Sequence, residues 1–535
     1  MVVPELRPWR AARPHVVRLA QAVRPRLARA ADSVRPHLAR AAAAAGPRAG
    51  RLARAARPRT PQARRTWQYT AGAATAGLAL AAAVVTAAGP WDDSGQRKAE
   101  RDWAAAQERA RGTDHAGTPA PAPPRPAPSA PAVLTGLGGR ADAVRAAPDG
   151  KALADVLGPL LKSPALGGRQ AVAVVDVATG RRLYGTGPGT ALTPASTTKI
   201  ATAVAVLSAL GADHRLTTRA VLEPDTNEVV LVGGGDPTLT ARAPAGGSAS
   251  LTELADRTAA ALAQRGIREV TLSYDKTLYT GPETHPIGVN TNLAPVTALM
   301  TDEGRTDDST SGPATRVPDP PADAARTFGG LLKERGILAK APGPSKATTR
   351  AQTLATVSSP PLSALVERML THSDNDLAEA LARQTALAIG KRADFAGAGE
   401  AIAAQLTKLG LPLKGAAFKD GSGLDRADRL TPDLLTALLV TAADPRHPDL
   451  RPVLTGLPVA GFTGTLASRY TDGAAGVVRA KTGTLTGVNA LAGTVVDRNG
   501  RLLAFAFLTS DTTSAATAQT TLDKAATALA GCGCR

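Results

Sequence analysis

The pattern of apolar positions predicts a strand and a buried helix early in the second quarter of the chain. Residues 171–177 are rich in valine, and the turn residues Thr179-Gly180 separate them from a short partner segment at 181–184, which predicts a hairpin. The run 200–210 carries no charge and is apolar apart from Thr202 and Ser208, until Gly211 ends it. We therefore predict a buried helix that begins at Ser196, shortly after Pro194.

The end of the chain repeats the strand pattern. Residues 488–496 are mainly apolar, residues 502–508 are wholly apolar, and the two segments flank the turn sequence at 497–500, so they predict a second hairpin. A final helix is predicted over 512–530. Strands at both ends with helices between them favour an α/β (α+β) fold, in which an antiparallel sheet carries helices on both faces and an all-helical half lies beside it.

The first 65 residues differ from the remainder in charge. They carry sixteen arginines, no lysine and two acids, Glu5 and Asp32, so most of the net charge of +18 belongs to this segment. We interpret it as a largely disordered cytoplasmic arm that contacts anionic lipid, with a simple solvated tail as the alternative. Nucleic acid is not expected as a partner, because Trp9 is its one aromatic residue.

Residues 66–91 are uncharged and have Trp67 and Tyr69 at one end and Trp91 at the other. At about 1.5 Å per residue a helix of this length crosses a bilayer. The arginine-rich arm then places the N-terminus in the cytoplasm and the remainder outside, as a single-pass membrane protein. A buried soluble helix and a cleaved signal are the alternatives. Residues 92–132, charged and then rich in proline and alanine, are predicted to be an extended linker.

Three short motifs occur in one order: Ser196-Thr197-Thr198-Lys199, Ser373-Asp374-Asn375 and Lys481-Thr482-Gly483. Each is common alone, and a second S-x-x-K occurs at 273–276, in a strand-like context. Together, and in this order, they describe one acyl-transfer site. No cluster of metal ligands and no phosphate-binding loop is found, so we expect no metal and no cofactor.

The residue types suit covalent catalysis. Ser196 at a helix start lies near free backbone N–H groups, and Lys199 is one turn further on the same face. A lysine can serve as the base for serine when burial lowers its pKa. Ser373 and Asn375 fall between two helical patterns, where helix capping is the ordinary alternative. Lys481 lies on a strand whose Gly483 leaves room for a peptide.

Three further segments indicate which family of acyl-transfer enzymes the chain resembles. The sequences at 233–239 (GGGDPTL), 420–424 (DGSGL) and 479–485 (RAKTGTL) resemble the D-alanyl-D-alanine carboxypeptidase/endopeptidase family, the class C low-molecular-mass penicillin-binding proteins. This resemblance covers roughly residues 133–535 and implies the penicilloyl-serine transferase (β-lactamase/transpeptidase-like) fold. Members of that family carry an extra domain between the first two motifs.

The interval between Ser196 and Ser373 fits such an insertion, because it has its own hairpin, helix and strand patterns. We predict an inserted domain over 213–349, and a catalytic domain made of 133–212 and 350–535. The inserted elements are predicted at 216–222, 228–232, 251–265 and 269–274.

The resemblance implies a serine D-Ala-D-Ala carboxypeptidase, with endopeptidase activity left open, that acts on peptidoglycan stem peptides and binds β-lactam antibiotics covalently. It assigns Ser196 as nucleophile and Lys199 as its base. The N–H groups of Ser196 and Thr484 would hold the oxyanion. In the same scheme Ser373, Asn375 and Lys481 pass the proton to the leaving amine. Thr482 and Thr484 bind the terminal carboxylate, and Gly483 belongs to the substrate-binding strand as the residue that leaves room for the peptide.

Two alternatives remain at this point. A β-lactamase would use the same acylation residues, but no E-x-x-L-N pattern follows Asn375 before Lys481 to activate a deacylating water. A wall-binding anchor without chemistry would not need the complete motif set, which is present.

Overall fold

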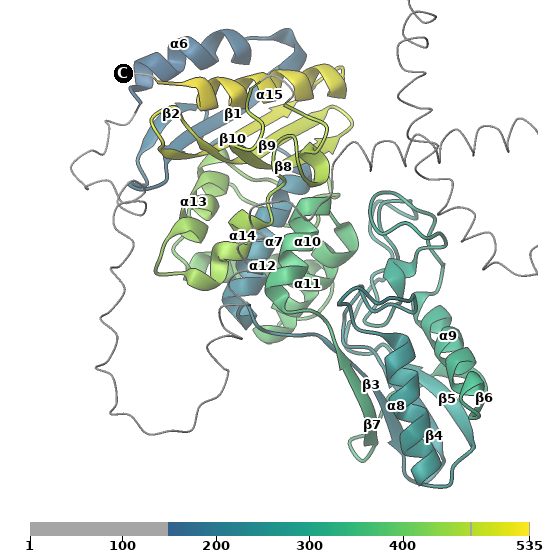
Figure 1. Cartoon of the computed structure of the whole chain (residues 1–535). Coiled ribbons are helices and arrows are strands. Elements are labelled where there is room, and N and C mark those ends of the chain that lie inside the picture. Colours follow the sequence, from purple (N-terminus) through teal and green to yellow (C-terminus); the bar gives the residue numbers. More distant parts are fainter. Residues whose placement is uncertain (1–147, 471–472, 534–535) are drawn as a thin grey trace, which may run out of the picture. The chain divides into compact units, whose positions relative to one another are not determined.

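The computed structural model describes residues 148–470 and 473–533. The basic arm, the span predicted at 66–91 and the linker lie outside these described residues. Among the helices of the described part, none is long and apolar enough to cross a membrane. The described chain builds two five-stranded sheets, each with its own helices (Figure 1).

The first sheet joins the two ends of the described chain. Its strand order is β2-β1-β10-β9-β8, and every neighbouring pair is antiparallel. Early strand β1 pairs with late strand β10, so that Val174 lies opposite Phe505. The strands are β1 (Arg169–Asp176), β2 (Arg182–Thr186), β8 (Val478–Leu485), β9 (Val488–Val496) and β10 (Leu502–Ser510).

Alternating side chains of β10 serve two different cores, as the two-residue period of a strand requires. Leu503, Phe505 and Phe507 pack in one cluster with α6 (Gly150–Leu161) and α15 (Ala515–Gly531). Ala504, Ala506 and Leu508 belong to the cluster on the other face, which includes α13 (Pro432–Ala443). Figure 1 shows this sheet between α6 and α15 on one side and α13 on the other. The predicted fold class, an antiparallel sheet with helices on both faces, is therefore confirmed.

The helical half surrounds α7 (Thr198–Leu210), which is buried on every side from Thr198 to Leu207. This burial explains why the run after Lys199 is almost wholly apolar, because a helix buried all round has no need of a polar face. Its neighbours are α10 (Leu362–His372), α11 (Asn375–Ala388), α12 (Phe395–Lys408), α13 and the short α14 (Arg451–Thr455).

The second sheet has the order β6-β5-β4-β3-β7, with α8 (Leu251–Gln264) and α9 (Pro320–Glu334) packed on it. The pairs β4–β5 and β5–β6 are parallel, and α8 and α9 are their crossover helices. The strands are β3 (Thr217–Glu223), β4 (Glu228–Val232), β5 (Glu269–Asp275), β6 (Leu338–Pro344) and β7 (Gln352–Ser358).

The end of the insertion predicted at residue 349 is corrected by this sheet. Strand β7 pairs antiparallel with β3, from Thr217 opposite Ser358 to Leu222 opposite Gln352. Because the hydrogen bonds of β7 are made to the second sheet, the inserted unit continues through Ser358.

A long segment between β5 and α9, residues 276–319, contains no strand and one 3-10 turn at Asp302–Gly304. Its first part contacts α11. Tyr279 Oη donates to Ala380 O at 3.2 Å, and the Arg383 guanidinium donates to Thr280 O at 3.2 Å and to Pro282 O at 3.1 Å. The inserted unit is thus joined to the helix that carries Asn375.

Gly493 on β9 provides a test of how tightly the first sheet is packed beside Lys481. A Cβ atom at this position would lie 2.0 Å from the carbonyl oxygen of Arg479 on β8. We expect Gly493→Ala to lower the free energy of unfolding by roughly 1–3 kcal/mol, the usual range for overpacking. Thermal denaturation of the purified protein measures this as a lower Tm.

Gly343→Ala on β6 is the matched control, since a Cβ there meets no atom within 4 Å. Equal melting temperatures for the two variants would contradict the packing argument.

Candidate active site

Ser196 lies in a 3-10 turn, Ala195–Thr197, that leads directly into α7. Ala195 is fully buried and has a φ of 48°, which is uncommon for a residue with a side chain. The hydroxyl of Thr197 donates to Pro194 O at 2.7 Å and closes the turn. This local geometry sets the position of the serine at the start of the helix.

Two glycines allow other segments to approach this turn. A Cβ on Gly423, whose φ is +83°, would lie 1.9 Å from the carbonyl oxygen of Ala195, and a Cβ on Gly483 would lie 2.6 Å from that of Pro194. The 420–424 loop and strand β8 can therefore contact the serine turn because both lack a side chain at the point of contact.

Lys199 lies beneath Ser196 and is completely buried. Its Nζ is 3.1 Å from Ser196 Oγ, 2.6 Å from Asn375 Oδ1 and 2.7 Å from the carbonyl oxygen of Ser422. Burial lowers the pKa of Lys199 to about 8, although nearby carboxylates, chiefly those of Asp420 and Glu379, act in the opposite direction. An amine with such a pKa is partly deprotonated near neutral pH and can accept a proton.

Lys481 on β8 is the second fully buried lysine. Its Nζ donates to Ser373 Oγ at 2.9 Å and to Thr482 O at 2.9 Å. Burial, together with repulsion from the Lys199 ammonium, holds the pKa of Lys481 well below its usual range. Since two buried amines this close resist carrying charge together, one of them is favoured as neutral.

The turn between α10 and α11 presents Ser373 and Asn375 to these two lysines. Ser373 ends α10 in the left-handed region, with φ 57° and ψ 39°. Asp374 performs the capping that was weighed as the alternative role for this motif, because its carboxylate accepts the N–H of Leu377 at 3.0 Å. Ser373 remains available for Lys481, and Asn375 for Lys199.

The remaining predicted residues follow Lys481 along β8. The hydroxyls of Thr482 and Thr465 are 3.0 Å apart, and Thr484 Oγ1 accepts from Gln519 Nε2 at 3.1 Å. Thr484 is exposed and lines the same cleft as Ser196, Ser373 and Asn375. The structure therefore brings the predicted site residues together around one cleft, whereas Ser273 of the second S-x-x-K lies in β5 of the other sheet and its Lys276 pairs with Glu283 at 2.8 Å.

Part of the cleft wall comes from residues that no sequence motif identifies. Asn292, Arg305 and Arg316, all from the segment between β5 and α9, line it. The carbonyl of Asn292 accepts from Asn375 Nδ2 at 2.9 Å. This segment has no periodicity and no motif, so its position could not be inferred before the insertion was seen to contact α11.

A buried group of arginines and acids supports the Ser373–Asn375 turn from this side. Arg316 pairs with Asp376 at 3.0 Å, directly after Asn375, while Glu303 pairs with Arg305 at 2.8 Å and with Arg368 at 2.6 Å. Burial raises the pKa of Asp376 to about 6. The Arg316–Asp376 and Glu303–Arg368 pairs join the inserted unit to α11 and α10, the helices on either side of this turn.

Comparison with known proteins agrees with this geometry. The model of the D-Ala-D-Ala carboxypeptidase 3 (S13) family matches residues 153–314 and 305–530. Carboxypeptidase DacB of Mycolicibacterium smegmatis is 38% identical over 408 residues, covering 72% of this chain and 85% of that protein. A carboxypeptidase of Mycobacterium tuberculosis is 36% identical over 384 residues, with 69% and 81% covered.

A solved structure supports the fold. Penicillin binding protein 4 of Haemophilus influenzae aligns with a TM-score of 0.58 over 70% of this chain and 97% of that chain, at 21% identity. The penicilloyl-serine transferase fold implied by the motifs is therefore confirmed. With both parts of the family model matched and relatives above 30% identity over most of their length, the chain belongs to the D-Ala-D-Ala carboxypeptidase 3 (S13) family.

Proposed function

We propose that this protein is a serine-type D-Ala-D-Ala carboxypeptidase that cleaves peptidoglycan stem peptides through an acyl-enzyme on Ser196. Family membership makes it a peptidase, and the serine mechanism rests on one observation. The Nζ of the buried Lys199 contacts both Ser196 Oγ and Asn375 Oδ1 directly beneath a cleft.

In the first step Lys199, in its neutral form, accepts the proton of Ser196 as Oγ attacks the carbonyl between the two terminal D-alanines. A lysine is an effective base here because its pKa of about 8 is close to the working pH. The backbone N–H groups of Ser196 and Thr484, both at the cleft, would stabilise the oxyanion.

Departure of the terminal D-alanine requires a proton on its nitrogen. Ser373 and Lys481 are linked by a 2.9 Å hydrogen bond and supply a path for that proton. Thr482 and Thr484 would bind the terminal carboxylate on β8, the end strand of the first sheet. Water then releases the acyl group, and cleavage of a cross-linked peptide by the same steps would be endopeptidase activity.

β-Lactams are proposed to acylate the same serine. The solved structure of the Haemophilus influenzae protein with a bound β-lactam supports this for a chain of the same fold. The absence of an E-x-x-L-N sequence between Asn375 and Lys481 predicts slow release of the acyl group, in contrast to a β-lactamase.

Ser196→Ala is expected to abolish covalent labelling of the purified full chain by a fluorescent penicillin and to stop release of D-alanine from a pentapeptide, because the attacking hydroxyl is lost. Ser273→Ala, in the other S-x-x-K sequence, is the control and should label like the wild type. Equal labelling of Ser196→Ala and wild type would refute the assignment, and rapid nitrocefin turnover would favour a β-lactamase.

The acylation rate is expected to rise with pH through about 8 and then level off. Lys199 must be neutral to accept the proton, and its pKa is about 8, so the rate at pH 6 should be about 50-fold lower than at pH 8. Stopped-flow acylation by penicillin from pH 5.5 to 9.5 measures this. Lys199→Arg should be inactive throughout, since a guanidinium stays charged. A wild-type rate that falls as the pH rises through 8 would contradict the role of Lys199.

For placement, we propose that residues 66–91 anchor the protein in the cell membrane, with the arginine-rich arm in the cytoplasm on anionic lipid and the enzyme outside. The uncharged stretch between aromatic residues and the arginines before it support this. Protease added to wall-less cells should remove the catalytic body and leave a small arginine-rich fragment protected. Release of the whole protein by high salt, or a mature chain that begins near Ala88, would contradict the anchor.

A further inference from the structure

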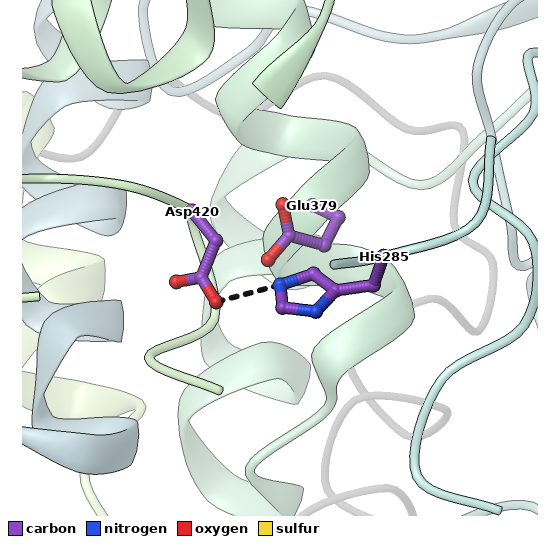
Figure 2. A group of neighbouring side chains, drawn as sticks. All are labelled: His285, Glu379 and Asp420. Atoms are coloured by element: carbon purple, nitrogen blue, oxygen red, sulfur yellow. Dashed lines mark hydrogen bonds and ion pairs between the residues drawn. The ribbon is translucent and has the colours of Figure 1, made fainter. Parts of the chain in front are cut away.

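Behind Lys199 lie three buried titratable side chains that the mechanism does not use: His285, Glu379 and Asp420 (Figure 2). They come from three parts of the chain. His285 belongs to the segment between β5 and α9, Glu379 to α11, and Asp420 to the loop that precedes α13. The side chains of His285 and Asp420 are 1% and 0% exposed. Burial of three such groups is unfavourable unless hydrogen bonds or ion pairs compensate for the lost contact with water.

The loop at 420–425 is held by these carboxylates through its backbone. Glu379 accepts the N–H of Gly421 at 3.1 Å and of Ser422 at 2.8 Å. Asp420 accepts the N–H of Gly423 at 2.6 Å and of Asp425 at 2.7 Å. All four donors belong to the stretch that passes beneath Lys199.

The peptide group between Ser422 and Gly423 connects Lys199 to Asp420. The carbonyl of Ser422 accepts from Lys199 Nζ at 2.7 Å, and the N–H on the same peptide plane, that of Gly423, donates to Asp420. Because a peptide group is planar, the carboxylate that holds the N–H also fixes the direction in which the carbonyl points. Asp420 therefore sets one of the three oxygen contacts of Lys199.

His285 in turn orients Asp420. Its Nε2 is 2.9 Å from Asp420 Oδ2, and its Nδ1 accepts the N–H of Ile287 at 3.2 Å. Since Nδ1 accepts, the ring proton is on Nε2, which donates to the carboxylate. The ring of Phe395 packs edge-on against the imidazole at 5.1 Å between centroids. The histidine is thus fixed in both tautomer and orientation.

The ligand atoms of these three residues lie close enough together to contact a single metal ion. Both nitrogens of His285 are already engaged, however, and each carboxylate accepts two backbone N–H groups. The arrangement is that of a hydrogen-bonded support rather than of a metal site.

We infer that His285, Asp420 and Glu379 are positioning residues that hold the Ser422 carbonyl against Lys199, so that the inserted unit fixes the general base of the catalytic unit. The inference rests on the proposed Ser196 mechanism. It also assigns a role to the insertion, which supplies His285 although it contributes none of the three motifs.

The network also acts on Lys199 through charge. The Asp420 carboxylate has the largest effect among those that raise the pKa of Lys199, against the stronger effect of burial. The charged or titratable groups that face Lys199 are Asp420, Glu379, Asp374, Asp428 and Lys481. Removal of the charge of Asp420 should therefore lower the pKa of Lys199 further.

The test measures the second-order rate of acylation by fluorescent penicillin as a function of pH, on the full chain. His285→Ala should reduce the rate about tenfold, because the Asp420 carboxylate loses a buried donor. His285→Gln should recover most of it, since an amide N–H can donate in place of Nε2–H. His214→Ala, at an exposed histidine on the chain between α7 and β3, is the matched control and should equal the wild type.

Asp420→Asn should move the rising limb of the pH profile to lower pH by about 0.5–1 unit, as expected for removal of one nearby negative charge. Glu379→Gln should shift the limb in the same direction and serves as a second variant if Asp420→Asn does not fold. Melting temperatures of all variants separate these effects from loss of folded protein.

A wild-type rate for His285→Ala would overturn the inference. So would parallel losses of rate and stability in both His285 variants together with an unmoved pH limb in Asp420→Asn and Glu379→Gln, which would show a purely structural role. Failure of the His285 series alone leaves the Ser196 assignment intact. Labelling of Ser196→Ala would instead refute the proposed function, and the inference with it.

Discussion

The burial of Lys199 is the constraint on which the remainder of the site depends. A buried amine must find oxygen partners, because transfer of an ammonium group out of water without them is strongly unfavourable. Its three partners are Ser196 Oγ, Asn375 Oδ1 and the Ser422 carbonyl, and they belong to a 3-10 turn, to α11 and to a loop. Loss of any of these contacts would leave the amine under-coordinated. The packing of the helical half around α7 therefore also brings together the three hydrogen-bond partners of the general base, Lys199.

The first sheet supplies the second buried amine, that of Lys481, and the register of its strands determines the position of this amine. Strand β8 places Lys481 beside Ser373 through its register with β9, in which Lys481 lies opposite Ala492. Because burial and, to a smaller extent, the Lys199 ammonium disfavour charge on Lys481, the two lysines share a limited capacity for positive charge. A proton taken up by Lys199 from Ser196 lowers the tendency of Lys481 to keep its own. This coupling suits a site that must accept a proton on one side and deliver one on the other.

The sequence was informative where structure is local. Mainly apolar runs and turn residues predict the buried helix after Ser196 and the hairpin of β9 and β10. The three motifs identify the side chains that the structure brings around one cleft. The predicted end of the insertion at residue 349 was wrong because β7 pairs with β3, which is distant in sequence, and no local sequence pattern indicates such a pairing. Arg305, Arg316 and His285 were missed because they lie in a long segment without periodicity, whose position depends on contacts with α11. The 420–424 sequence does not reveal its contribution to Lys199, because that contribution is a backbone carbonyl.

Helix α11 shows how a sequence could indicate such contacts. Asn375, Glu379 and Arg383 are spaced four residues apart and so lie on one face of the helix, and the latter two are almost fully buried. Buried polar residues at this spacing require partners from outside the helix. Asn375 donates to Asn292 O, and Arg383 donates to the carbonyls of Thr280 and Pro282. Glu379, between them, holds the loop beneath Lys199. One face of α11 thus contacts both the inserted unit and the general base, Lys199. Because Asn375 contacts Asn292 of the insertion and Lys199 at the same time, a movement of the insertion relative to α11 would change the surroundings of the Lys199 amine.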